Sequence, residues 1–165
     1  MSTANRAVVS TSTVGQTRAL GRRIARFLRV GDVVFLQGPL GAGKTALAQG
    51  VGQGLKLDTV VASPTFVLMA KHEATEASPA LYHADLYRLT DPDEVADLAL
   101  EAQAADGILL IEWAERGLEV LPPEHLLIVL EPSEDKANKP KERRITIVAN
   151  GDRYRRILDG LGARG

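Results

Sequence analysis

The sequence predicts a three-layer α/β domain whose mixed sheet is parallel in its centre. Two observations support this fold class. Strand-like apolar runs alternate with helical patterns along the chain, as expected when helices cover both faces of a sheet. The segment Gly38–Thr45 fits G-x-x-x-x-G-K-[ST] and directly follows the apolar run Val33–Leu36, which is the strand–loop–helix setting of a phosphate-binding P-loop. The predicted fold is therefore a P-loop NTPase domain.

The first part of the chain predicts two strand–helix units. A capping-box pattern, Thr13-x-x-Gln16, starts the first helix, and glycines close the helix behind the P-loop. Arginines at spacings of four, four and three give the first helix a basic stripe. We interpret the stripe as a solvated polar face, with docking to an acidic partner or to RNA phosphate as the alternative. The elements are strands at 6–11 and 33–37 and helices from Thr13 to about Leu28 and from Thr45 to about Gln53, and the stripe consists of Arg18, Arg22, Arg26 and Arg29.

The remaining chain predicts two hairpins that add antiparallel strands to the sheet. Asp91-Pro92-Asp93-Glu94 starts a helix, because it offers an aspartate N-cap followed by a proline in the first turn. The apolar run 108–111 is typical of a strand buried on both faces. The polar stretch 131–143 predicts a mobile loop at about 132–142, and residues 163–165 are expected to be a flexible tail. The elements are strands at 66–69 and 81–86, separated by the polar stretch 71–78, strands at 108–111, 125–130 and 144–148, and helices from 91 to about 104 and from 152 to 161.

Composition restricts the function classes. With 165 residues and 45% hydrophobic content, the chain can bury one substantial core, and we expect a single domain over residues 1–165. The sequence contains no cysteine, which excludes thiolate chemistry and indicates a reducing, cytoplasmic setting. No run approaches the about 18 apolar residues of a membrane span, so no membrane association is expected. The net charge of −1 and the 4% aromatic content argue against an independent nucleic-acid surface.

The P-loop residues have distinct chemical roles. Lys44 is a mobile point charge able to reach the β- and γ-phosphates, and the Thr45 hydroxyl is a hard oxygen ligand suited to Mg²⁺. Pro39 removes one backbone donor, so the phosphate cradle is expected to depend on later amides. The expected ligand is a nucleoside triphosphate. The residues predicted to bind it here are Gly38, Leu40, Gly41, Ala42, Gly43, Lys44, Thr45 and Ala46.

Two acidic residues are candidates for chemistry beside the P-loop. Glu112 directly follows a buried apolar strand, which is the position of a Walker-B acid that holds the metal. Asp85 lies near the end of the predicted strand 81–86. It either positions an attacking water or holds a metal-bound water, or it makes a structural hydrogen bond or a salt bridge with Arg88. His83, two residues earlier on the same strand face, is interpreted as a structural donor.

The segment Ser63-Pro64-Thr65-Phe66 follows the P-loop helix at the distance where nucleotide switches place a loop over the γ-phosphate. Pro64 keeps Ser63 extended, and the hydroxyls of Ser63 and Thr65 are within reach of phosphate, metal or water in such a loop. From the residues alone, the competing interpretation is a turn that begins a strand.

Four sequence blocks together resemble the bacterial TsaE (YjeE) family. The blocks are Gly38–Thr45, Ser63-Pro64-Thr65-Phe66, Tyr82-His83-Ala84-Asp85-Leu86-Tyr87-Arg88 and Ile111-Glu112-Trp113. A P-loop alone is shared by many proteins, but its combination with the other three blocks, in this order and at these intervals, is specific.

The resemblance implies an ATPase subunit of the bacterial machinery that makes N6-threonylcarbamoyladenosine next to the anticodon of tRNAs. The implied ligands are ATP and Mg²⁺. The implied partners are a TsaD-like transferase, which transfers the threonylcarbamoyl group, and a TsaB-like subunit that supports it, so tRNA is contacted indirectly through the complex. Slow hydrolysis by the isolated chain is expected.

The resemblance also implies roles for individual residues. Lys44 and Thr45 hold phosphate and Mg²⁺, Glu112 takes the metal-binding role, and Asp85 is the second essential acid. Lys44, Asp85 and Glu112 are therefore the expected catalytic residues.

Two further residues gain a role only through the resemblance. Thr65 gains a switch-like contact with the nucleotide. Trp113 becomes a candidate aromatic near the nucleotide, with a buried structural tryptophan as the alternative. Pro39 departs from the acidic residue that is usual in the family, which affects the rim of the loop rather than phosphate binding.

Three other nucleotide-dependent functions remain open from the residues. A small-molecule kinase needs a lid that bears arginines, and the stretch 131–143 has its arginines at the far end. A GTPase is disfavoured because Asn138-Lys139-Pro140-Lys141 ends in a lysine, which cannot accept the guanine N–H donors. A non-catalytic nucleotide-binding scaffold is the third alternative.

Overall fold

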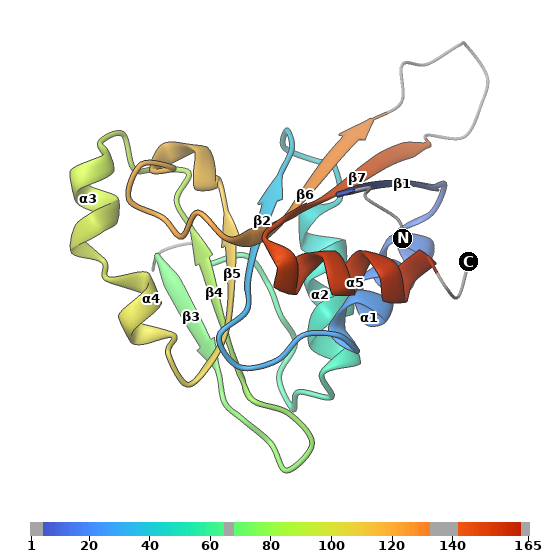
Figure 1. The fold of residues 1–165 in the computed structure, drawn as a ribbon, viewed down its shortest axis with the longest axis horizontal. Coiled ribbons are helices and arrows are strands. Elements are labelled where there is room, and N and C mark those ends of the chain that lie inside the picture. The colour runs from blue at the N-terminus through green and yellow to red at the C-terminus, as the bar shows by residue number, and fades with distance from the viewer. Residues whose placement is uncertain (1–4, 65–67, 133–141, 163–165) are drawn as a thin grey trace.

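A seven-stranded mixed sheet forms the centre of the molecule (Figure 1). The computed structural model describes residues 5–64, 68–132 and 142–162. The strand order is β1-β7-β6-β2-β5-β4-β3. The strands are β1 (Arg6–Thr11), β2 (Val33–Gln37), β3 (Met69–His72), β4 (Ala80–Asp85), β5 (Gly107–Glu112), β6 (His125–Pro132) and β7 (Arg143–Asn150).

The sheet is parallel in its centre and antiparallel at its margins, which confirms the prediction. β2 pairs in parallel with β5 and β6, and β4 pairs in parallel with β5. The strands β3, β7 and β1 are added in antiparallel orientation. Since parallel strands end at the same edge of a sheet, β4 and β5 bring Asp85 and Glu112 to the edge where β2 meets the glycine-rich loop.

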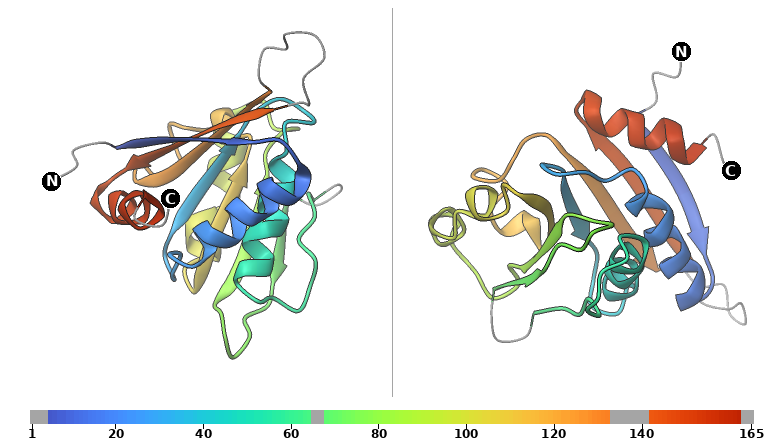
Figure 2. Two further views of the ribbon diagram at one scale, coloured as in Figure 1. Left: turned by 90° about the vertical axis from the view of Figure 1, so that its right-hand side faces the viewer. Right: turned by 90° about the horizontal axis from the view of Figure 1, so that it is seen from below.

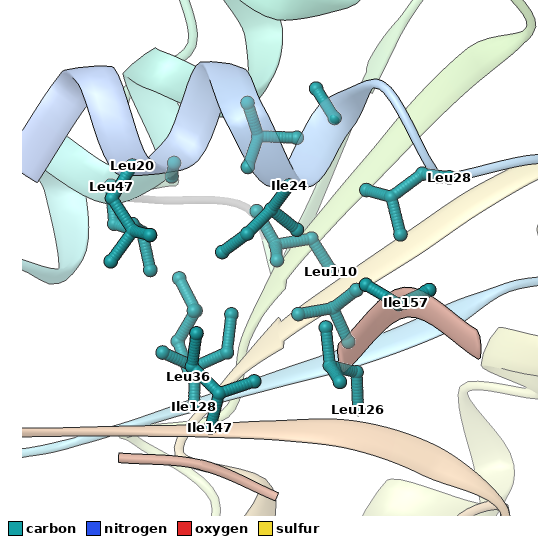
Figure 3. Close-up of a cluster of buried hydrophobic side chains, with 14 of the residues drawn as sticks. Leu20, Ile24, Leu28, Leu36, Leu47, Leu110, Leu126, Ile128, Ile147 and Ile157 are labelled. Atoms are coloured by element: carbon teal, nitrogen blue, oxygen red, sulfur yellow. The ribbon is translucent and has the colours of Figure 1, made fainter. Parts of the chain in front are cut away.

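Helices cover both faces of this sheet (Figures 1 and 2). Side chains of α1, α2 and α5 pack against one face in a shared apolar cluster, where Ile24 and Leu47 approach Leu36, Leu110 and Ile128 of the strands (Figure 3). A second cluster on the other face includes α3, α4 and the short 3₁₀ helix η1. The helices are α1 (Val14–Ala25), α2 (Lys44–Gly54), α3 (Pro92–Asp97), α4 (Leu100–Gln103), η1 (Ala114–Arg116) and α5 (Asp152–Gly162).

The basic stripe of α1 is only partly a solvated face. Arg18 donates to Gln49 Oε1 of α2 at 3.0 Å, and Arg22 donates to Gln53 Oε1 at 2.8 Å. These two arginines therefore join α1 to α2, and of the four only Arg18 is half-buried. Arg22, Arg26 and Arg29 are exposed, but α1 ends at Ala25 rather than near Leu28, so Arg26 and Arg29 lie beyond the helix.

The helices α1 and α2 approach so closely that glycines at their contact have no room for a methyl group. A Cβ atom added to Gly50 would lie 2.1 Å from the backbone oxygen of Arg18, and one added to Gly21 would lie 2.4 Å from that of Leu47. The contact holds α2, and with it the glycine-rich loop, in a fixed place against α1.

Replacing Gly50 with alanine is expected to lower the free energy of unfolding by about 2 kcal/mol. Overpacking costs about 1–3 kcal/mol, and here the obstacle is backbone, while the higher helix propensity of alanine returns about 1 kcal/mol. Urea unfolding measures the change. Gly15→Ala in α1 is the matched control, because the nearest atom to its added Cβ is 3.8 Å away, and this variant should be neutral or slightly stabilised. Equal stability of the two variants would contradict the close contact.

The continuous helix predicted from 91 to about 104 is wrong, because the chain breaks between α3 and α4. Ala99 adopts a left-handed conformation with φ of 47°. On one continuous helix, Val95 and Leu100 would point about 140° apart, yet both are buried in the same apolar cluster. The break allows both side chains to face the sheet, and their burial outweighs the cost of about 1–2 kcal/mol for the left-handed alanine.

The strand predicted at 66–69 lies further along the chain. Residues 65–67 are outside the described residues, and β3 begins at Met69 and continues to His72, which the sequence had placed partly in a loop. Pairing of Lys71 with Tyr82 of β4 sets this register. Because β3 is an edge strand, Lys71 is tolerated there, and its Nζ atom lies 5.5 Å from the centroid of the Tyr82 ring.

Several expectations fall on residues that the structure does not describe. These are most of the loop expected at about 132–142, the tail 163–165, the segment 138–141 compared with a guanine-binding motif, and Thr65. None of the described helices is long and apolar enough to cross a membrane.

Candidate functional site

The glycine-rich loop connects the carboxyl end of β2 to the amino end of α2. Gly43 is the N-cap of α2 and has a φ of 107°, a left-handed conformation that favours glycine. Gly38 is required for a different reason, because a Cβ atom there would lie 2.5 Å from the backbone oxygen of Leu130 in β6. The amide of Ala42 donates to the Pro39 oxygen at 3.1 Å, which closes the turn. The loop therefore lies directly at the positive end of the α2 dipole.

Lys44 folds back over this loop. Lys44 is only 6% exposed. Its Nζ atom donates to the Gly38 backbone oxygen at 2.7 Å and lies 4.1 Å from the centroid of the Trp113 ring. Burial lowers the pKa of the Lys44 ammonium group, and the nearby Glu112 and Asp85 carboxylates oppose this shift. A cation this poorly hydrated binds a phosphate oxygen strongly.

A series of hydrogen bonds connects the start of α2 to β5. The hydroxyl oxygens of Thr45 and Ser63 are 3.0 Å apart, and Ser63 donates to Glu112 Oε2 at 3.1 Å. His83 Nε2 lies 2.7 Å from the same oxygen. Because Ser63 uses its only hydrogen on Glu112, the Thr45 hydroxyl must donate to Ser63. The lone pairs of Thr45 that remain are free to bind a cation.

The two predicted acids have pKa values shifted in opposite directions. Burial by itself would raise the pKa of Glu112, but the hydrogen bond from His83 and smaller contributions from its other neighbours hold it below its ordinary value. Burial raises the pKa of Asp85, although the amide of Tyr87 donates to Asp85 Oδ1 at 3.0 Å and opposes the rise. Glu112 is therefore suited to stay charged, and Asp85 accepts a proton more readily than an ordinary aspartate.

Trp113 lies at the turn between β5 and η1, beside the P-loop lysine. Its φ of 61° is left-handed, a conformation that costs a bulky residue about 1–2 kcal/mol. The half-buried ring has Lys44 Nζ over it, the Tyr87 ring at a centroid distance of 4.9 Å, and Arg116 Cζ at 5.6 Å from its centroid. Trp113 thus contacts Lys44 of the loop and also packs against the second apolar cluster.

The oxygen donors near the loop fit Mg²⁺ as part of a coordination shell. In the described part of the chain, no cluster of three or more histidine, aspartate or glutamate side chains could hold a metal ion by itself. The available donors are the Thr45 hydroxyl and the Glu112 carboxylate, which are hard oxygen ligands. Mg²⁺ in proteins commonly has one or two such ligands and completes its shell with phosphates and water, so these residues fit a cation that arrives with a nucleotide.

The structure brings most of the predicted site residues together. Lys44, Thr45, Glu112 and Trp113 are connected by contacts at the loop, and Asp85 lies opposite Glu112 in the sheet register. The predicted nucleotide-binding residues between Gly38 and Ala46 lie in the loop and the first turn of α2, whereas Thr65 lies outside the described residues. Among the described residues, no ion pair joins Asp85 to the exposed Arg88, so the structural hydrogen bond of Asp85 is the one to Tyr87.

Sequence reasoning missed the involvement of His83. It is a donor, as interpreted, but its acceptor is the predicted metal ligand Glu112. The signal that could have found it is the spacing of two from Asp85, which places both side chains on one face of a strand that ends at the loop.

Comparison with known proteins agrees with this arrangement. The family model for the threonylcarbamoyl adenosine biosynthesis protein TsaE matches residues 11–145. The chain belongs to the TsaE family. The match covers the glycine-rich loop and every acidic residue of the site, and it confirms the resemblance carried by the four sequence blocks.

Named TsaE relatives match over most of their length. The TsaE protein of Streptomyces coelicolor is 40% identical over 139 residues, which cover 83% of this chain and 93% of that protein. The TsaE protein of Bacillus subtilis is 38% identical over 147 residues, which cover 88% and 87%. A crystal structure of Bacillus subtilis YdiB superposes with a TM-score of 0.77 at 32% identity and covers 96% of this chain and 95% of that one. The mixed sheet described here is therefore similar to a solved fold.

Proposed function

We propose that this TsaE-family protein is a P-loop NTPase: a Mg²⁺-dependent, ATP-hydrolysing subunit that supports threonylcarbamoyl transfer to a tRNA adenosine. The observation that carries the proposal is the series from Thr45 through Ser63 to Glu112 beside the Lys44 ammonium group. It supports the proposal because an ammonium group, a hydroxyl group and a carboxylate lie around one glycine-rich loop, and P-loop NTPases use these three groups on a triphosphate.

The loop and Lys44 would bind the triphosphate. Amides at the start of α2 and the helix dipole favour the phosphate charge, and Lys44 Nζ would exchange the Gly38 oxygen for phosphate oxygens. Thr45 and Glu112 would hold the metal. Magnesium, when bound, neutralises the charge that develops on the β- and γ-phosphate oxygens.

Asp85 is suited to orient the water that attacks the γ-phosphate. The water oxygen forms a bond to phosphorus while the bond to the β–γ bridging oxygen breaks, and the proton of the water leaves to the Asp85 carboxylate or to a phosphate oxygen. The raised pKa of Asp85 favours the first acceptor. Glu112 remains charged at the metal throughout.

The proposed partners are a TsaD-like transferase and a TsaB-like subunit, as the family membership suggests. Hydrolysis would perform conformational work on these partners, and tRNA would be contacted through the complex rather than by this chain alone. We expect slow turnover by the isolated protein. Rapid hydrolysis without the partners would contradict control by the complex, and transfer of phosphate to a metabolite in preference to water would support a small-molecule kinase.

Depletion of this protein is expected to remove threonylcarbamoyladenosine from cellular tRNA. Wild-type protein should restore the modified nucleoside, whereas Lys44→Ala should not, because the phosphate-binding cation is lost. Mass analysis of tRNA nucleosides measures both results. Normal levels of the nucleoside after depletion would refute the role in tRNA modification and leave ATP binding untouched.

Binding of Mg²⁺ and ATP is expected to change the fluorescence of Trp113, which is the only tryptophan in the chain. The Lys44 ammonium group lies over its ring and would move to the phosphates, so the electrostatic environment of the indole changes. A fluorescence titration of the wild-type protein measures this effect. Unchanged emission at ATP concentrations that saturate binding by calorimetry would show that Lys44 stays on the ring.

A further inference from the structure

Two buried histidines lie behind Glu112, and each has one ring nitrogen without a partner. His83 Nδ1 and His72 Nε2 are two of three such buried side-chain atoms in the described part of the chain. His83 has no exposed surface, and His72 is 8% exposed. Since buried polar atoms are almost always hydrogen-bonded, two unpartnered nitrogens on neighbouring strands require a common explanation.

The sheet register places the two rings beside each other. Ala70 lies opposite His83, and His72 lies opposite Leu81. His72 is therefore a diagonal neighbour of His83 on the same face of the sheet, and such residues are about 7–8 Å apart at the backbone. Over that separation, one buried water can bridge two imidazole nitrogens.

The other ring nitrogen of each histidine has a partner, and these partners determine which nitrogen carries the ring hydrogen. His83 Nε2 lies 2.7 Å from Glu112 Oε2, and His72 Nδ1 lies 2.6 Å from Thr59 Oγ1. An ionised carboxylate only accepts, so the hydrogen of His83 is on Nε2 and a neutral ring has its acceptor at Nδ1. That acceptor needs a donor, which His72 supplies if its own hydrogen is on Nε2. His72 Nδ1 then accepts from the Thr59 hydroxyl.

We propose that Thr59, His72 and His83 form one hydrogen-bond chain in which every donor points toward Glu112, and that the two histidines are positioning residues for this carboxylate. The link between the rings contains one buried water, because the two nitrogens do not hydrogen-bond each other directly. Burial lowers the pKa of His72, which agrees with a neutral ring at that position. The effect of the two histidines on metal binding rests on the proposed function. The hydrogen-bond chain itself does not, because it involves only groups of the protein and buried water.

The hydrogen-bond chain gives the segment after α2, which contains Thr59 and Ser63, a second connection to the Glu112 carboxylate. Ser63 donates to Glu112 directly, and Thr59, four residues earlier, reaches it through the two rings. Thr59 also lines a surface hollow with Gln49, Gln53 and Val60. Displacement of this segment would therefore alter how Glu112 is held, and binding at Glu112 would in turn affect the segment.

Nuclear magnetic resonance of protein with ¹⁵N-labelled histidine tests the hydrogen-bond chain, because it shows which ring nitrogen carries the hydrogen. No nucleotide is needed. We expect both His72 and His83 to carry the ring hydrogen on Nε2 at neutral pH, and the Nε2 hydrogen of His83 to exchange slowly with water. A hydrogen on Nδ1 of either ring would overturn the proposal. Because the measurement needs no ATP, a failure of the proposed ATPase function would leave this result unaffected.

Substitution of His83 tests its effect on Glu112. His83→Asn keeps a polar group only near Nδ1, so we expect the gain in ADP affinity that Mg²⁺ provides to fall about 10–100-fold, while affinity measured in EDTA stays unchanged. His83→Gln restores a donor near Nε2 and should recover most of the loss. Equal losses with and without Mg²⁺, or no recovery by glutamine, would overturn the positioning role.

Two further variants separate positioning from general effects on the fold. His72→Leu removes the donor to His83 without touching Glu112 and should reduce the Mg²⁺-dependent gain in the same direction as His83→Asn. His125→Asn is the control, because His125 takes no part in the hydrogen-bond chain. It stacks on Phe35 at a centroid distance of 3.8 Å and hydrogen-bonds Asn150. If His125→Asn lowered the Mg²⁺-dependent gain as much as His72→Leu, the effect would belong to the fold and the proposal would fail. Thermal unfolding of each variant accompanies the titrations.

Discussion

Replacing Glu112 with glutamine is expected to reduce Mg²⁺-dependent ATP hydrolysis by about 100-fold or more and to leave the fold intact. Glutamine matches the side chain in size, and its amide oxygen still accepts from His83 and Ser63, which are the observed partners of Glu112 Oε2. The negative charge that Glu112 would place beside the proposed metal is lost. A metal site supplies several kcal/mol of charge stabilisation, and about 1.4 kcal/mol corresponds to a factor of ten in rate.

Single-turnover hydrolysis at saturating ATP and Mg²⁺ in the assembled complex measures this loss. Glu115→Gln is the matched control, because Glu115 is exposed and close enough to raise the pKa of Lys44, yet it does not contact the network around Thr45. We expect this control to stay within about twofold of wild type, as is usual for an exposed charge. Similar losses in the two variants would mean that charge near Lys44, rather than a metal ligand at the end of β5, determines the rate.

The glycine-rich loop and Glu112 could be predicted from sequence because each belongs to a contiguous pattern. Gly38–Thr45 carries its strand and helix context with it, and Glu112 directly ends an apolar run. The contact between His83 and Glu112, and the position of His72 behind them, depend instead on how three strands pair. No local pattern records a pairing register, so this part of the site became visible only in three dimensions.

In the fold too, features set by local sequence could be predicted, whereas features set by tertiary contacts could not. Alternating apolar runs and the capping box at Thr13 describe local preferences, and the predicted sheet centre and the start of α1 are confirmed. The break at Ala99 runs against local preference, because the surrounding alanines and leucines favour a continuous helix. Burial of Val95 and Leu100 against the same side of the sheet decides the outcome, and a tertiary contact of this kind cannot be inferred from one stretch of sequence.

Replacing Lys44 with methionine is expected to lower ATP affinity by at least about tenfold and hydrolysis by about 100-fold or more, while raising the stability of the protein. In the proposed function, Lys44 supplies the positive charge that the phosphates and the transition state require. Burial lowers its pKa, so the folded state binds this proton less tightly than the unfolded state does. At every pH below the folded-state pKa the charged lysine therefore costs stability, and methionine removes that cost while keeping a long side chain against Trp113.

Lys71→Met provides a control of opposite sign, because Lys71 also lies over an aromatic ring but is far more exposed. Its neighbour Tyr82 and the charge of Glu73 raise its pKa, so the folded state favours the charged form and its removal should slightly lower stability. ATP binding should not change. Calorimetric titration with ATP and thermal unfolding measure both properties for the two variants. A Lys44→Met protein that is inactive but more stable would show that the buried ammonium group is retained for phosphate at the expense of folding, whereas a loss of stability without a loss of affinity would assign Lys44 to the structure instead.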